Sequence, residues 1–130
     1  ALTNVTVGKY YIVDAFDDDP YPFYIAQVKK IHAADAQGGQ TLTVVFLEIA
    51  DATNGADLTT INEFLTSKYQ TQGKGNSNKT TQVDNAELHE EISMKNGGSK
   101  GKFMIAATSM ASAKAWARHL APNSTGAVQN

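Results

Sequence analysis

The densest group of side chains that could do chemistry lies between residues 10 and 24. Three consecutive carboxylates, Asp17, Asp18 and Asp19, stand close to Asp14. The segment around them carries these aromatic residues: Tyr10, Tyr11, Phe16, Tyr21, Phe23 and Tyr24. Because consecutive strand residues point to opposite faces, some of these rings must lie beside the carboxylates. Rings attract cations by up to about 2 kcal/mol when desolvated, and carboxylates add Coulomb attraction. This predicts a pocket for a methylammonium or guanidinium group; the alternative is a solvated turn whose rings cover the core and strand edges.

The sequence gives little support for catalysis. Cys is absent, which excludes thiol chemistry and Cys-bound zinc. The histidines stand in no zinc-binding spacing, and the glycine-rich stretches 73–75 and 97–101 lack the strand–helix context of a phosphate-binding loop. We therefore expect no catalytic residue, no metal and no cofactor. A metal-dependent enzyme that uses Asp14 and the Asp17–Asp19 run is a minor alternative.

Size and charge limit the partner class. The chain has 130 residues, which suits one domain, and a formal net charge of −2. A weakly acidic chain is not typical of a strong nucleic-acid or membrane-surface binder. Its apolar runs are too short to span a membrane. Nucleic acid is a minor alternative through a patch formed by converging loops. The lysines of this patch would be Lys29, Lys30, Lys68, Lys74, Lys79, Lys100 and Lys102.

Three segments with two-residue periodicity must position the aromatic and acidic side chains. We predict strands over 9–15, 23–31 and 42–49, which are rich in β-branched and aromatic residues. Prolines on either side of Tyr21 break the chain between the first two strands, so Tyr21 is expected in an exposed turn. The polar, glycine-containing segment 33–40 predicts the second connection. Together these features predict an antiparallel meander.

The middle of the chain indicates a short helix and then a loop. Apolar residues at helical spacing predict a helix over 57–69, with Thr60 and Glu63 as a capping box. The segment 70–81 is almost wholly polar, so we expect an exposed loop there.

Two structures compete for the segment that follows. The turn sequence Asn96-Gly97-Gly98 favours a hairpin between 87–94 and 102–107. The alternative is a helix over 84–95 with its own capping box and a glycine stop. The sequence leaves both open and favours the hairpin.

A helix is predicted near the end of the chain, over about 109–120. Ser109 can cap it, and Pro122 stops it. Its apolar stripe would be formed by Met110, Ala113, Trp116, Ala117 and Leu120. The domain would span 1–121, followed by a flexible tail over 122–130. The expected fold is mainly β: a small antiparallel barrel of the Src-homology-3 type with this C-terminal helix and one further short helix.

Two stretches resemble a known family. Residues 16–28, FDDDPYPFYIAQV, resemble the Tudor family, in which an aromatic residue and a short acidic turn precede an aromatic–x–Ala–x–Val strand. Residues 44–51, VVFLEIAD, are similar to the next Tudor strand. The bromo-adjacent homology (BAH) domains share a similar barrel core, and PFYIAQV resembles them equally well.

The resemblance implies an aromatic cage. Phe16 matches the aromatic residue of the first loop, Tyr24 that of the second strand, and Phe46 the first Tyr of the third strand. Asp51 stands near the polar residue that follows. Ile49 occupies the place of a second Tyr, so the implied cage is incomplete. With Tyr21 and the acidic turn added, the candidate ligand-binding residues are Phe16, Asp17, Asp18, Asp19, Tyr21, Tyr24, Phe46 and Asp51.

By resemblance, the chain is expected to be a non-enzymatic recognition module that binds a peptide, with methylated Lys or Arg of a histone or other protein as the target. Such a reader would be intracellular and nuclear; three N-x-S/T sequons keep secretion open. The alternative is a structural or scaffolding domain of a larger assembly, which packs through the helix that carries Trp116 or through a strand edge. The start at Ala1 is typical of a processed or excised segment and suits either function.

Overall fold

The three alternating segments of the first half form adjacent antiparallel strands. The structure, a computed structural model, describes residues 4–15, 21–50, 60–74 and 77–120. In it, β1 spans Tyr10–Asp14, β2 spans Phe23–Ile31 and β3 spans Thr41–Ile49. β2 pairs with β1 on one side and with β3 on the other. The predicted meander is therefore confirmed, and each strand agrees with its expected limits to within one residue.

The alternation of these strands builds two apolar cores, one on each face. The helix-side core consists of Ile12, Phe23, Ile25, Leu47, Ile49, Ile61, Phe64, Leu65, Tyr69, Ile92, Ile105, Ala113 and Ala117. The second core consists of Tyr11, Val13, Ala26, Val28, Leu42, Val44, Val83 and Leu88. Tyr24 and Phe46 pack against this second core and are half-buried. The two-residue period of β1–β3 therefore places these two rings on the face opposite the helices.

A short helix follows β3. α1 spans Ile61–Thr66, and the Thr60 hydroxyl accepts a hydrogen bond from the Glu63 N–H at 2.9 Å, as expected of its cap. The predicted helix over 57–69 is too long at its C-terminal end. The chain is extended again at Ser67, and β4 occupies Tyr69–Thr71. Tyr69 is buried in the helix-side core, and this packing outweighs the local helical pattern. Residues 57–59 lie outside the described residues.

The polar segment over 70–81 was wrongly expected to be a loop. It contains β5 (Gly73–Lys74) and β6 (Ser77–Asn78), which pair with each other, and it continues into β7 (Thr80–Asp84). β7 pairs with Thr41–Val45 of β3. Backbone hydrogen bonds hold β7 in place, while Val83 is its one buried side chain. Strands were predicted from the sequence by the alternation of apolar residues. An edge strand of this kind has no such alternation and was therefore missed.

The segment for which a hairpin and a helix were both considered forms strands and a hairpin. A single 3-10 turn, η2 (Asn85–Glu87), leads into β8 (Leu88–Ile92) and β9 (Met94–Asn96). β9 pairs antiparallel with β10 (Phe103–Ile105), so the favoured hairpin forms, but over shorter strands than the predicted 87–94 and 102–107. The alternative prediction of a helix over 84–95 is wrong, although the predicted capping box forms and caps the single turn of η2. Pairing of β8 with β1 keeps the chain extended beyond that turn.

The C-terminal helix, α2, spans Ala107–Leu120 and begins two residues before the predicted start. Ser109 therefore lies inside the helix, and its hydroxyl accepts a hydrogen bond from the Ser93 N–H at 2.8 Å. The predicted stripe faces the helix-side core. Ala113 and Ala117 are buried in it, and these residues pack against it: Met110, Trp116 and Leu120. The predicted tail lies outside the described residues.

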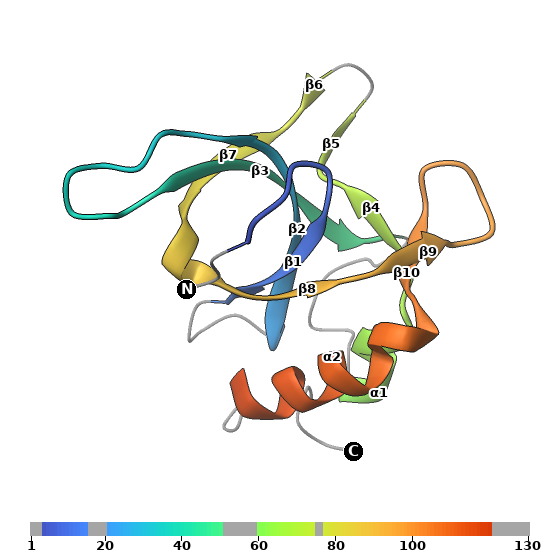
Figure 1. Ribbon diagram of the computed structural model, residues 1–130. Coiled ribbons are helices and arrows are strands. Elements are labelled where there is room, and N and C mark those ends of the chain that lie inside the picture. Colours follow the sequence, from blue (N-terminus) through green and yellow to red (C-terminus); the bar gives the residue numbers. More distant parts are fainter. Residues whose placement is uncertain (1–3, 16–20, 51–59, 75–76, 121–130) are drawn as a thin grey trace.

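Eight of the ten described strands join into one curled antiparallel sheet, and β5 and β6 form a separate two-stranded sheet. The order of the larger sheet is β8-β1-β2-β3-β4-β10-β9, with β7 beside the first part of β3. β8 and β9, at the two ends of this path, are separated in the chain by Ser93 alone. The path therefore returns to the segment where it started, which gives a barrel-like shape. Figure 1 shows α1 and α2 side by side against this sheet, with the β5–β6 hairpin at the far end. The mainly β fold with a C-terminal helix is confirmed.

Candidate functional site

The structure describes three of the predicted site residues, Tyr21, Tyr24 and Phe46. The others lie outside the described residues: Phe16, Asp17, Asp18, Asp19 and Asp51. The three that are described form a continuous row of ring contacts. Tyr24 lies between Tyr21, at a centroid distance of 5.9 Å, and Phe46, at 5.7 Å. The structure therefore brings these three aromatic residues together in one row.

Strand register explains why Tyr24 meets Phe46. Ala26 of β2 lies opposite Phe46 of β3, so Tyr24 is a diagonal neighbour of Phe46 on the same face. Their planes meet at 64°, an edge-to-face arrangement that places the positive edge of one ring against the negative face of the other. Both rings are half-buried, so part of their surface stays accessible.

Tyr21 differs from its expected exposure. It precedes β2 in a bend, as predicted, but it is half-buried and packs against the helix-side core. Its ring lies 5.4 Å from that of Phe64 in α1. Tyr21 therefore connects the helix side to Tyr24, whereas it does not line the pocket described next.

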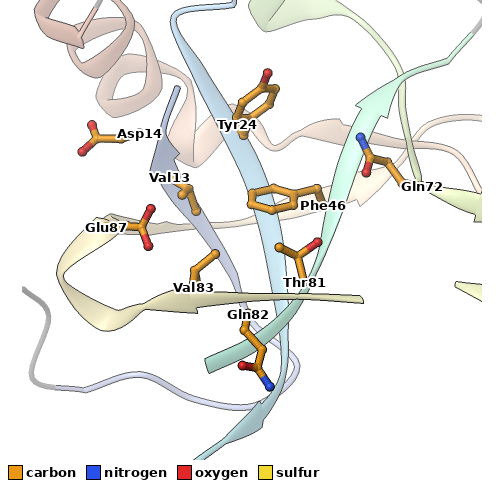
Figure 2. A pocket seen from close by; sticks show the side chains of 9 residues that line it. All are labelled: Val13, Asp14, Tyr24, Phe46, Gln72, Thr81, Gln82, Val83 and Glu87. Atoms are coloured by element: carbon orange, nitrogen blue, oxygen red, sulfur yellow. The ribbon is translucent and has the colours of Figure 1, made fainter. Parts of the chain in front are cut away.

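A pocket of about 230 Å³ opens beside Tyr24 and Phe46. Its lining comes from β1, β2, β3, β7, η2 and the residue after β4. The lining residues are Val13, Asp14, Tyr24, Phe46, Gln72, Thr81, Gln82, Val83 and Glu87. Figure 2 shows the two rings on one side of this space and the carboxylates of Asp14 and Glu87 on the other. Apolar side chains form the floor, since Val13 and Val83 belong to the second core.

Each carboxylate is held by a neighbour. The Glu87 Oε2 accepts a hydrogen bond from the Asp84 N–H at 2.8 Å as part of the capping box. The Asp14 Oδ1 lies 2.5 Å from the His89 Nε2, with 49% of the Asp14 side chain exposed. The side chains of Asp14 and Glu87 are both exposed to solvent. The pocket therefore combines two fixed anionic groups with two aromatic surfaces.

The sequence reading missed most of this lining. Glu87 was considered only as a helix cap or as the first residue of a hairpin strand. Thr81 fell in the predicted loop, and Gln82 and Val83 were assigned to no strand. Asp14 was noted beside the acidic run but was not placed among the candidate ligand-binding residues. The Asp84–Glu87 capping box was recognised as the start of a helix, and in the structure it caps the single turn that brings Glu87 to the pocket.

A second group of polar contacts lies next to the pocket, where α2 meets β8. The ring of His89 lies 4.7 Å from that of Trp116. The Trp116 Nε1 donates to the Glu90 Oε1 at 2.8 Å, and the Ser112 hydroxyl donates to the Glu90 Oε2. Through His89, the pocket residue Asp14 is thus connected to the C-terminal helix.

Two tyrosines outside the pocket lining have perturbed ionisation. Burial raises the pKa of Tyr69 well above its usual value, and the nearby Tyr21 raises it further. Partial burial also raises the pKa of Tyr10. Both hydroxyls therefore favour the neutral form, and neither contributes charge to the pocket near neutral pH.

In the part of the chain that the structure describes, no three His, Asp or Glu side chains are grouped to hold a metal ion. The helices of this part are too short or too polar to cross a membrane. Comparisons with protein-family models, curated proteins and solved structures found no match to this chain.

Proposed function

We propose that the protein is a non-enzymatic recognition module that binds a cationic side chain of a partner peptide in the pocket between Tyr24, Phe46, Asp14 and Glu87. Methylated Lys or Arg is the expected target. The observation that carries the proposal is the placement of two accessible rings opposite two carboxylates around one pocket of about 230 Å³. The proposed pocket therefore lies beside β7 and η2, whereas the sequence prediction placed most of the candidate site at residues 16–21.

The energetics favour an organic cation. A cation over a desolvated ring gains about 2 kcal/mol or more. Unit charges about 4 Å apart attract by about 1 kcal/mol in water and about 4 kcal/mol near a protein surface. Methylation removes hydrogen-bond donors from the ammonium group, which makes it easier to desolvate against Tyr24 and Phe46. An alkylated ammonium therefore suits this pocket better than an unmodified one.

The family resemblance supports the same proposal. Tyr24 and Phe46 are the cage positions that the Tudor-like pattern implies, and the barrel-like sheet is compatible with a Src-homology-3-like or BAH-like core. We therefore propose this class of barrel for the chain. A nuclear location follows if the target is a histone tail.

Calorimetric titration tests the proposal. The probe is a short Gly/Ser-flanked peptide with one central Lys, unmodified or mono-, di- or trimethylated. We expect the trimethylated peptide to bind about tenfold more tightly than the unmodified one, which corresponds to about 1.4 kcal/mol. Tyr24→Leu and Phe46→Leu should each remove most of this preference, because each deletes one ring of the pair.

Matched variants separate binding from folding. Phe103→Leu removes a half-buried ring that packs 6.1 Å from Tyr10, outside the pocket lining, and should leave the preference intact. Glu87→Gln removes the charge and still allows a capping box. Equal affinity for all methylation states, or equal loss in Phe103→Leu and Phe46→Leu, would contradict the proposal.

The alternative function, a structural or scaffolding domain, stays a prediction. Trp116, through which such packing was expected, is half-buried and directs its indole N–H to Glu90 within the chain. Light scattering distinguishes the two functions. A concentration-dependent increase in mass would favour the scaffold, and a monomer that binds the methylated peptide would favour recognition.

A further inference from the structure

β7 presents an open backbone edge beside the pocket. Among the described residues, its only strand partner is β3. The Asp84 N–H donates to the Glu87 side chain, whereas the next amide, Asn85, donates to the Gln40 carbonyl at 2.8 Å. Because hydrogen-bonding direction alternates along an antiparallel strand, the backbone groups of Thr80 and Gln82 point away from β3.

The side chains of β7 alternate in the matching way. Figure 2 shows Thr81 and Val83 directed toward the rings of Tyr24 and Phe46, and Gln82 directed away from them. Thr81, Gln82 and Val83 all line the pocket. A backbone that paired with the outer edge of β7 would therefore run along the pocket, with alternate side chains on the side of the rings.

Among the described residues, no strand pairs with the outer edge of β7. β7 lies beside β3 on one side of the curled sheet, and β8 lies beside β1 on the other. η2 follows β7 and contributes Glu87 to the pocket, whose other lining residues come from β1, β2, β3, β7 and the residue after β4. Exposed strand edges are templates for the addition of another strand.

The charges near this edge select the partner. Asp84, at the end of β7, and Glu87, in the following turn, are exposed, as is Asp14 on the neighbouring wall. These carboxylates stand around the end of the edge that adjoins the pocket. A basic peptide is the partner whose charge complements them.

We propose that a basic peptide adds to β7 as an extended strand and places one alkylated-ammonium side chain in the pocket. The inference rests on the proposed function and adds the conformation of the partner and its main-chain contacts. The backbone edge supplies affinity that does not depend on sequence, and the pocket supplies selectivity for one side chain.

Peptide chemistry tests this directly. One probe is capped trimethyllysine, acetylated and N-methylamidated, which has no strand to add. The others are trimethyllysine peptides with backbone N-methyl groups at either odd or even amides. Because alternate amides of an added strand face β7, one N-methylated series should bind about tenfold more weakly than the other. The unmodified-backbone peptide should bind at least about tenfold more tightly than the capped residue.

A protein variant tests the same edge from the other side. Gln82→Pro removes an outward-facing N–H, which an edge strand tolerates, and it should weaken peptide binding several-fold. Gln82→Ala removes the same side chain but retains the N–H. Equal weakening in both variants would overturn strand addition, as would equal affinity of both N-methylated series. If the capped residue binds as tightly as the peptide, only strand addition fails; if none of the probes binds, the proposed function itself fails.

Discussion

At the scale of single residues, the Tyr69 hydroxyl is a polar group that lies within the helix-side core. Tyr69 is 2% exposed, and its hydroxyl donates to the Phe64 carbonyl. Burial first, and then Tyr21, raise its pKa in the folded state. A raised pKa means that this neutral hydroxyl stabilises the fold fully below the unfolded-state pKa near 10, and that this contribution is lost as pH rises toward the folded-state value.

Tyr69→Phe should therefore flatten the alkaline limb of the stability profile. The wild type should lose stability above about pH 10 by up to about 1.4 kcal/mol per pH unit for this one proton. The variant should lose about 1 kcal/mol at neutral pH, because the Phe64 carbonyl loses the Tyr69 hydroxyl and retains the Ser67 N–H at 3.4 Å as a donor. Urea unfolding at several pH values measures both effects.

Tyr10→Phe is the comparison for this prediction. Tyr10 is only partly buried, and its pKa is raised by that burial, so its variant should flatten the alkaline limb less. An alkaline limb equally steep in Tyr69→Phe and wild type would contradict the assignment to Tyr69.

At the scale of elements, the docking of α2 depends on one carboxylate of β8. Glu90 accepts hydrogen bonds from Trp116 and Ser112, both on α2. Glu90→Ala should destabilise the protein by about 1 to 3 kcal/mol, since it leaves the half-buried indole N–H without its acceptor. Because the Trp116 indole loses its hydrogen-bond acceptor, the emission spectrum of Trp116 should change in the same variant.

The adjacent carboxylate provides the control. Glu91 is exposed and also lies in β8, and Glu91→Ala should change stability by less than about 0.5 kcal/mol. A similar loss of stability in both variants would indicate a general effect on β8 and would contradict a specific role for Glu90.

Elements whose pattern is local could be predicted from the sequence, and those held by distant contacts could not. β1, β2 and β3 are rich in β-branched and aromatic residues because both faces of the sheet are largely buried, so these strands could be predicted from the sequence. The proximity of Tyr24 to Phe46 was implied by the family resemblance. β7 was missed because its pairing with β3 uses backbone groups and needs no apolar side chain. For the same reason Glu87 and Thr81 were missed as pocket residues, since β7 positions them.

At the scale of the whole molecule, stability should decrease from the centre of the sheet to its edge. β2 and β3 are each paired along most of their length and buried on both faces. β7 is paired on one side and has mainly exposed side chains. Hydrogen exchange should therefore be slowest in β2 and faster in the paired amides of β7, by about tenfold or more.

Exchange in the presence of the trimethyllysine peptide extends this prediction. An added strand should protect the outward-facing amide of Gln82, and β2 should change little. Exchange at Gln82 that stays the same under saturating peptide would contradict strand addition, whatever the affinity of the pocket.

In the proposed complex, one cationic group of the peptide lies between the rings of Tyr24 and Phe46 and the carboxylates of Asp14 and Glu87. Intermolecular nuclear Overhauser effects from the N-methyl protons of a trimethyllysine peptide measure this contact directly. The account predicts effects to the ring protons of both Tyr24 and Phe46. Effects to Tyr10 and Phe103 in their place, or no effect to either pocket ring at saturating peptide, would contradict it.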